Sequence, residues 1–293
     1  MRTISIILST IFLVLIIGCN TVKESNSNSK KTKKMESKNL KNTAKKAQEA
    51  FFSTYNEEGI KKYFSKNYIQ HNPNIPTGIG PVLEFLPILK KAGTTSKTHR
   101  MLQDNNYIVM HNTYNNAEAF GAKEVVTFDV WKIDEEKVTE HWDAVSPIVK
   151  TTTSGRSQFD GMTEITDLNK TQDNKKIVEN FINDVLFGNN PNKITNYIST
   201  EKYYQHNTNI ADGLDGLGKA IDYLVSQNDM FVYKKVHKIL GEGNFVLTIS
   251  EGEWHNKPHA FYDLFRLENA KIVEHWDVIQ ETPKKMAHNN GMF

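Results

Sequence analysis

The chain has 293 residues and a net charge of +2, a length that suits one or two globular domains. Its basic excess is local, because residues 20–50 hold nine lysines against three glutamates and the remainder is net acidic. A nucleic-acid-binding protein would carry such an excess on its folded domains, so this class is excluded. Cys19 is the only cysteine, which excludes a disulfide framework.

Met1 and the charged Arg2 precede an apolar run from Ile4 to Ile17, which is too short for a comfortable membrane span. The run ends in Ile16-Ile17-Gly18-Cys19, which resembles the lipobox of bacterial lipoproteins. In that family the signal is cleaved before the cysteine, which then carries lipid. The resemblance implies a signal peptide over residues 1–18, lipidation of Cys19 and attachment to a membrane of the bacterial cell envelope. An unmodified thiol is the alternative.

Residues 19–42 are mostly Ser, Asn, Lys and Thr. Such a stretch cannot bury enough apolar surface to offset the entropy lost on ordering. We predict a flexible basic tether here. Its lysines would contact anionic lipid headgroups, or the stretch would serve only as a soluble spacer.

Two strings occur twice in the chain. Tyr68-Ile69-Gln70-His71-Asn72 returns as Tyr204-Gln205-His206-Asn207, and Glu140-His141-Trp142-Asp143 returns as Glu274-His275-Trp276-Asp277. The shift of about 135 residues is too long for a solenoid unit, so it indicates two whole domains. We predict domains over residues 43–150 and 171–285, a linker over 151–170 and a tail over 286–293.

In the first copy, helical spacing of apolar residues predicts helices at Ala44–Tyr55, around Ile60–Phe64 and at Val82–Lys91. The Tyr-to-Asn string is interpreted as a turn or loop, because prolines follow it. Strands are then expected at Lys97–Leu102, Tyr107–His111, Glu124–Ile133 and Val138–Ile148.

The second copy predicts the same order of elements. Helices are expected at Lys175–Leu186, Lys193–Tyr197 and Leu217–Val225, and strands at Tyr233–Leu240, Phe245–Ser250, His259–Leu267 and Lys271–Ile279. Helices followed by antiparallel strands indicate an α+β fold in each domain. The linker is unpatterned, with room for a short edge element.

Each copy places an aspartate in mid-strand among large apolar residues, Asp129 in the first and Asp263 in the second. A carboxylate in that setting is costly unless it has a partner. If the loop after the strand has an odd number of residues, Asp129 faces His141 and Asp143. With an even loop it would face Trp142 instead. We expect the odd loop, and hence two aspartates and a histidine on one concave face.

Two close carboxylates cannot both ionise easily, so one pKa should rise, and a raised aspartate beside a histidine suits proton transfer near neutral pH. His71 and His206, on the loop that caps the sheet, would donate a hydrogen bond to a carbonyl oxygen of the ligand. The candidate catalytic residues are Asp129, His141, Asp143 and His71 in the first copy, and Asp263, His275, Asp277 and His206 in the second. The alternatives are that His141 and His275 pair with Glu140 and Glu274 at the surface, and that His71 and His206 only cap the loop.

Trp142 and Trp276 are candidates either for the core or for a ligand platform. His99 and His237 recur with the repeat and join them as candidate ligand-binding residues. A metal site is the other use of His and Asp in one cavity, but no closely spaced ligand motif supports one. We predict no metal and no cofactor, since phosphate loops, nucleophile elbows and dinucleotide fingerprints are also missing from the sequence.

The repeated motifs, together with Lys-Ile-Val-Glu-His-Trp-Asp-Val-Ile-Gln at 271–280, resemble the SnoaL-like polyketide cyclase family of the nuclear-transport-factor-2-like superfamily. The resemblance implies two tandem cone-shaped domains, each with about three helices packed on a curved antiparallel sheet. In the characterised cyclases, an aspartate matching Asp277 is the acid/base of an intramolecular aldol condensation, helped by a histidine matching His275. The repeat carries these roles to Asp143 and His141, and the family places polar pocket residues at Asp263 and Asp129.

The first copy departs from the family pattern at Gly80-Pro81, at Thr139 and in a longer loop before Glu124. This superfamily uses one pocket for several reactions and for plain binding, so the fold does not name a reaction. We expect either an enzyme that removes a proton next to a carbonyl, or a cell-envelope protein that binds a small apolar or aromatic ligand. A third hypothesis is vestigial pockets in domains that only pair. The resemblance further implies an intrachain pseudo-dimer.

Overall fold

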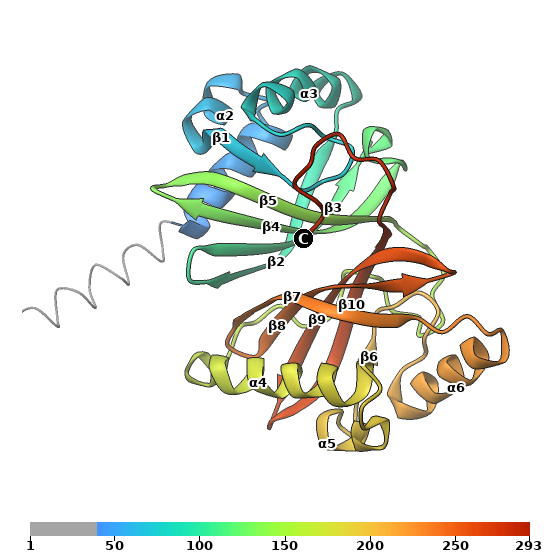
Figure 1. Cartoon of the computed structure of the whole chain (residues 1–293). Coiled ribbons are helices and arrows are strands. Elements are labelled where there is room, and N and C mark those ends of the chain that lie inside the picture. The colour runs from blue at the N-terminus through green and yellow to red at the C-terminus, as the bar shows by residue number, and fades with distance from the viewer. Residues whose placement is uncertain (1–39) are drawn as a thin grey trace, which may run out of the picture. The chain divides into compact units, whose positions relative to one another are not determined.

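The computed structural model describes residues 40–293 (Figure 1). The predicted signal peptide, the lipidated Cys19 and most of the predicted tether lie outside these residues. Within the described part of the chain, no helix is both long enough and apolar enough to cross a membrane.

The helices of the first repeat cover one face of its sheet. The N-terminal helix is described over residues 40–52, and α2 (Glu57–Tyr63) and α3 (Ile79–Ala92) follow. Asn56 caps α2 by accepting hydrogen bonds from the backbone N–H groups of Glu58 and Gly59. Apolar residues of all three helices pack on the sheet in one cluster that includes Ala47, Ile60, Val82, Ile108 and Trp131.

The sheet of the first repeat contains β1 (Phe64–Gln70), β2 (Thr95–Asp104), β3 (Tyr107–Asn115), β4 (Glu124–Asp134) and β5 (Lys137–Pro147), in the order β1-β5-β4-β3-β2. A short 3-10 turn, η1 (Glu118–Phe120), interrupts the connection from β3 to β4. Strands β2 to β5 form an antiparallel meander, and β1 pairs in parallel with β5. The predicted loop at Tyr68–Gln70 is therefore wrong, because the backbone of β5 pairs these residues as an edge strand.

The second repeat has the same plan. Its helical elements are η2 (Leu168–Lys170), α4 (Thr171–Phe181), the π-helical turn η3 (Ile182–Leu186), η4 (Pro191–Lys193), α5 (Ile194–Tyr197) and α6 (Gly213–Ser226). Its strands are β6 (Tyr204–Gln205), β7 (Val232–Glu242), β8 (Phe245–Trp254), β9 (Lys257–Glu268) and β10 (Lys271–Glu281), in the order β6-β10-β9-β8-β7. Each repeat is thus an α+β unit, as the sequence predicts, and its sheet has a fifth strand at the edge in addition to the four predicted strands.

A β-bulge sets the register of each site hairpin. Glu135 and Glu136 have φ values of 50° and 61° and form a two-residue turn, so the expected odd loop is wrong. The extra residue lies in the strand instead: the pairing shifts between Ile133 and Lys132, which leaves Thr139 without a counterpart. The shift restores the expected pairing of Asp129 with Asp143. Val273 is the corresponding extra residue between β9 and β10.

One hydrophobic cluster draws on both repeats. Its buried members include Phe128, Val130 and Trp142 of the first repeat and Tyr262, Leu264 and Trp276 of the second. The contacts are reciprocal, since the Arg100 guanidinium lies 4.1 Å from the ring centroid of Trp276 and Lys238 Nζ lies 3.9 Å from that of Trp142. Both tryptophans therefore belong to the core, and the ligand-platform interpretation is wrong.

Candidate active site

The site of the second repeat is built on two neighbouring strands and one loop. Asp263 of β9 pairs directly with Asp277 of β10, two positions after His275. His275 Nε2 lies 3.1 Å from Asp263 Oδ1, and Asn207 Nδ2 donates to Asp277 Oδ2 at 2.6 Å. Because alternate residues of a strand share a face, His275 and Asp277 point to the same side of the sheet as Asp263.

A glutamine fixes the proton on the other side of His275. Gln205 Oε1 accepts the backbone N–H of Asn207 at 3.0 Å and lies 2.9 Å from His275 Nδ1. Since this oxygen can only accept, Nδ1 carries a proton and donates it to Gln205. Burial opposes a second proton on His275, but Asp263 and Asp277 outweigh burial and raise the pKa of the imidazole. The site thus favours an imidazolium between two carboxylates.

Asp277 is the member of this group that is poised for proton transfer. Burial raises the pKa of its carboxyl group and the charge of Asp263 raises it further, while His275 and Asn207 offset only part of the effect. Tyr233 donates to the Asp263 carboxylate at 3.0 Å and 3.2 Å. A raised pKa brings an aspartate closer to the neutral pH at which it can serve as either acid or base.

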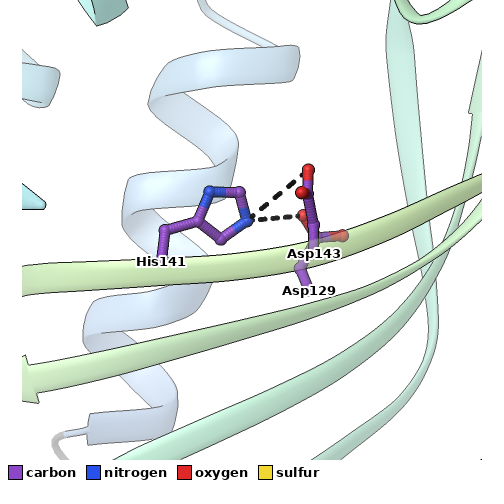
Figure 2. A group of neighbouring side chains, drawn as sticks. All are labelled: Asp129, His141 and Asp143. Carbon is purple, nitrogen blue, oxygen red and sulfur yellow. Dashed lines mark hydrogen bonds and ion pairs between the residues drawn. The ribbon is translucent and has the colours of Figure 1, made fainter. Parts of the chain in front are cut away.

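Figure 2 shows the equivalent group in the first repeat, with the ring of His141 directed at Asp129 and Asp143. His141 Nε2 lies 3.1 Å from Asp129 Oδ1 and 4.0 Å from Asp143 Oδ2. Burial raises the pKa of Asp143 to about 6. Burial acts the same way on Asp129, but hydrogen bonds from His141, Thr127 and Tyr114 outweigh it and lower the pKa of that carboxyl.

The two groups lie in cavities of very different size. The cavity of the second repeat measures about 1780 Å³, and Asp263, His275 and Asp277 line it. The rest of its wall is mainly apolar and includes Phe181, Leu186, Leu217, Ile221, Phe261, Phe265 and Ile279. The cavity that contains Asp129, His141 and Asp143 measures about 50 Å³. Of these two cavities, only that of the second repeat is large enough for a typical small-molecule ligand.

The structure corrects the expected position of His71 and His206. Among the described residues that line these two cavities, neither histidine is present. His71 stacks on Trp142 with ring centroids 4.7 Å apart, its Nε2 lies 2.9 Å from Glu140 Oε1, and its Nδ1 lies 2.8 Å from the Gly291 carbonyl oxygen. Strand alternation turns His71 to the face opposite Gln70 and Asn72, so it cannot reach a ligand carbonyl in the cavity.

His206 repeats this arrangement. It stacks on Trp276 at 4.6 Å, and its Nε2 lies 3.0 Å from Glu274 Oε1. Its Nδ1 lies 2.7 Å from the Ser157 carbonyl oxygen of the linker. The two glutamates therefore pair with His71 and His206 rather than with His141 and His275, which are buried and face the aspartates.

His99 and His237 also lie away from these two cavities. His99 Nε2 is 3.0 Å from Thr113 Oγ1, and burial together with Lys97 and Arg100 lowers the pKa of the ring to about 4. His237 stacks on Phe293 of the tail, with ring centroids 4.3 Å apart. The expectation that these two histidines contact a ligand is therefore wrong.

Sequence reasoning missed the polar residues that hold the site. Asn72 donates to both oxygens of Asp143 at 3.0 Å and 2.8 Å, and Asn207 and Gln205 act on Asp277 and His275. The signal was present, because Gln-His-Asn occurs in both copies and its first and third residues share a face once the segment is extended.

Either group has the donors of a metal site. The ligand atoms of Asp129, His141 and Asp143 lie within 4.8 Å of one another, as do those of Asp263, His275 and Asp277. Two carboxylates and a histidine suit a divalent cation in number and type. The same atoms already interact with one another and with neighbouring donors, so the absence of a metal and of a cofactor stays a prediction.

No family model matches the chain, and no curated protein matches it. Solved structures that are similar include a proposed SnoaL-like polyketide cyclase from Shewanella denitrificans, at 15% identity over 36% of this chain and 90% of that one, with a TM-score of 0.31. A nuclear-transport-factor-2-like protein of unknown function from Cytophaga hutchinsonii is 14% identical over 37% of this chain and 90% of its own, with a TM-score of 0.31. TsrD from Streptomyces laurentii is 12% identical over 37% of this chain and 88% of its own, with a TM-score of 0.32.

Proposed function

We propose that this protein binds a small, neutral carbonyl compound and moves a proton at the carbon next to the carbonyl group, in aldol condensation or related chemistry. The observation that carries the proposal is the placement of Asp277, with a raised pKa, beside His275 and Asp263 at the wall of a largely apolar cavity. Apolar walls would hold the body of the ligand, and the polar group would act on its reactive end.

In the proposed reaction, the Asp277 carboxylate takes a proton from the carbon next to the carbonyl. The electrons of the broken C–H bond move into the carbonyl group, which becomes an enolate. The positive charge of His275 offsets the charge on the enolate oxygen. In an aldol condensation, the enolate carbon then attacks a second carbonyl of the same molecule, and protonated Asp277 returns its proton to the alkoxide that forms.

The test is deuterium uptake into a neutral aryl methyl ketone in D₂O, followed by NMR. We expect the wild-type chain to catalyse the exchange and Asp277→Asn to lose roughly 10²-fold or more of the rate, the usual contribution of a general base. Asp143→Asn is the matched control and should keep the rate. Exchange that persists unchanged in the double Asp143→Asn/Asp277→Asn variant would contradict the proposal.

The size of the apolar cavity favours one alternative, a cell-envelope protein that binds an apolar or aromatic ligand without changing it. Mass spectrometry of small molecules that stay with the purified chain separates the two functions. A binding protein would retain an unaltered ligand and would not exchange deuterium into any carbonyl compound. An enzyme would release its product and would catalyse exchange.

Export and attachment through lipid on Cys19 belong to the same proposal, on the strength of the lipobox resemblance. Mass spectrometry of the mature N-terminus should find a diacylated Cys19, and Cys19→Ser should release the protein from membranes. We also propose that the two repeats act as an intrachain pseudo-dimer, which the shared hydrophobic cluster supports. The proposed partners are thus a small ligand and a membrane, and nucleic acid is not among them.

A further inference from the structure

We infer that ligand binding is confined to the second repeat, and that aromatic side chains of the first repeat, above all Phe85 and Phe120, seal its copy of the site. This division of labour deepens the proposed function and rests on it for the chemistry, although the binding asymmetry can be tested by itself. Four differences between the repeats support it.

The first difference is the filling of the cavity. The small cavity of the first repeat is lined by seven aromatic side chains besides Trp131, namely Phe51, Phe52, Phe64, Tyr68, Phe85, Tyr114 and Phe120. They pack on one another: Phe52 stacks on Tyr114 at 4.6 Å, and Phe85 meets Phe120 edge to face at 5.5 Å. These rings surround Asp129, His141 and Asp143 and leave a cavity of only about 50 Å³.

The second difference is the connection that delivers Phe120. In the first repeat β3 and β4 are joined by residues 116–123, which form η1 and bring Phe120 within 5.2 Å of the Tyr114 ring. In the second repeat β8 and β9 are joined by the tight turn of His255 and Asn256, whose φ values are 52° and 58°. This turn lines the open cavity and carries nothing across it.

The third difference lies on the sheet. Tyr114 pairs with Val125, which lies four residues before Asp129. Gly252 pairs with His259, which lies four residues before Asp263. Gly252 therefore takes the position of Tyr114 in the second repeat. A Cβ atom at Gly252 would overlap the Val232 carbonyl and lie 2.9 Å from Phe261 Cε2. No side chain fits at this position. Tyr233, which pairs with Gly252 from the edge strand β7, supplies the hydroxyl that donates to Asp263, and its ring lines the open cavity.

The site carboxylates of the two repeats also differ in their hydrogen bonds and in their exposure. Asp129 Oδ2 accepts hydrogen bonds from Asn112 at 2.8 Å, Tyr114 at 2.7 Å and Thr127 at 2.5 Å, besides the contact of Oδ1 with His141. Such a set of donors holds Asp129 as an ionised structural acceptor. Asp143 is 4% exposed, whereas Asp277 is half-buried at the open cavity. A ligand can reach Asp277 but cannot reach Asp143.

The fourth difference is the helix above the site. α3 buries Val82, Leu86 and Leu89, whereas α6 buries only Gly216 among its residues. Leu217 takes the place of Val82 when Gly78 is aligned with Gly213, and it lines the cavity instead of closing it. α6 therefore forms a wall of the binding site, while α3 belongs to a closed core.

The probe for the test is acedan, a neutral naphthyl ketone whose emission shifts to the blue in apolar surroundings. We expect the full chain to bind it, Leu217→Trp to weaken binding at least about tenfold by filling the second cavity, and Ile88→Trp, a matched change at an exposed position of α3, to bind like the wild type. Adding Phe85→Ala and Phe120→Ala to Leu217→Trp should restore binding by opening the first cavity. Both phenylalanines are partly exposed, and Phe120→Ala alone is the milder second variant if the double change unfolds the protein.

Three results would overturn the inference: no binding by the wild type, equal binding by the wild type and Leu217→Trp, or no gain from either opened variant that remains folded by circular dichroism. The result for Asp277→Asn separates this inference from the proposed function. Normal acedan binding together with unchanged deuterium exchange in that variant would remove the function and leave the binding asymmetry standing.

Discussion

At the scale of single residues, Asp143 and Asp277 show how the same position of a repeated motif acquires two roles. Both are third after the glutamate of the same motif, both pair with an aspartate across the hairpin, and an asparagine donates to each. The difference is access, because aromatic rings close the cavity at Asp143 and leave Asp277 at an open one. The chemistry of a site therefore depends on what fills the space in front of it.

Asp143→Asn should stabilise the protein at alkaline pH. Burial raises the pKa of Asp143 from 3.8 to about 6, so the folded chain holds this proton more tightly than the unfolded chain. Its stabilising contribution is complete below about pH 4 and is lost as the pH rises through 6. Asparagine keeps the hydrogen bond to Asn72 without the buried charge, and the gain at pH 8 should be on the order of 1 to 3 kcal/mol.

Urea unfolding of the wild type and Asp143→Asn at pH 8 and at pH 4 measures this effect. The difference in free energy of unfolding should be present at pH 8 and close to zero at pH 4. A difference of the same size at both values would show that the charge of Asp143 is not its cause.

The proposed activity should have a bell-shaped pH profile. The rate should rise as Asp277 loses its proton, at a pH above the ordinary aspartate value, because the pKa of that carboxyl is raised. It should fall as His275 loses its second proton, above the ordinary histidine value of 6.5. The pH dependence of kcat/KM for deuterium exchange reports both limbs. A profile in His275→Asn that keeps the upper limb would assign that limb to another group.

At the scale of elements, the site depends on two β-bulges that cannot be predicted from the sequence. Thr139 and Val273 continue the alternation of their strands, so the tight turns would place Trp142 and Trp276 opposite the aspartates if the pairing were regular. The inserted residues return the acidic residues to one face. The prediction of the facing pair was right although its stated cause, an odd loop, was wrong.

Most helices and strands could be predicted because their apolar periodicity is strong. The parallel edge strands could not, since β1 and β6 are held by the neighbouring backbone and carry no pattern of their own. The aspartates and His275 of the site could be placed from strand alternation. Sequence could not predict which face His71 and His206 occupy, nor that the first cavity is closed. Both depend on distant segments such as those of Ser157 and Phe120.

Gly161 of the linker should not tolerate a side chain. Its φ is +92°, and a Cβ atom there would overlap the Glu274 carboxylate and lie 2.9 Å from Trp276. Gly161→Ala should cost about 3 kcal/mol of stability, the sum of backbone strain and overpacking. The control is Gly155→Ala, which has a φ of +77° but open space around its Cβ position and should cost only about 1 to 2 kcal/mol. Equal losses in thermal unfolding would mean that the linker does not pack on this face.

At the scale of the whole molecule, each repeat is closed by a segment that follows the last strand of the other repeat. The linker after β5 contacts His206 and Trp276, where the Asp160 carbonyl oxygen accepts the indole N–H at 2.9 Å. The tail after β10 contacts the first repeat, where the Gly291 carbonyl oxygen lies 2.8 Å from His71 Nδ1. The histidines expected in the active site thus hold these segments in place.

Removing residues 287–293 should therefore loosen the first repeat. The change deletes the hydrogen bonds of Asn290 to Gln70 and Thr77 and the buried Met292 of the shared cluster. We expect a loss of about 2 to 5 kcal/mol, as for other large deletions of buried contacts, and easier quenching of Trp142 fluorescence by acrylamide. Asn289→Ala, at an exposed tail position, is the control and should change neither. A truncated chain as stable as the full one would contradict the closing role of the tail.

In the proposed function, Asp277 in the open cavity is the group that meets the ligand carbonyl. The most direct measurement is affinity labelling of the full chain with a neutral bromomethyl naphthyl ketone, with the modified peptide located by mass spectrometry. A carboxylate oxygen displaces bromide and forms an ester, so the label marks the carboxylate nearest the bound carbonyl. We predict that Asp277 is labelled ahead of every other carboxylate, that acedan protects it, and that Asp277→Asn abolishes the protected label. Equal labelling of Asp143, or labelling that acedan does not suppress, would contradict the account.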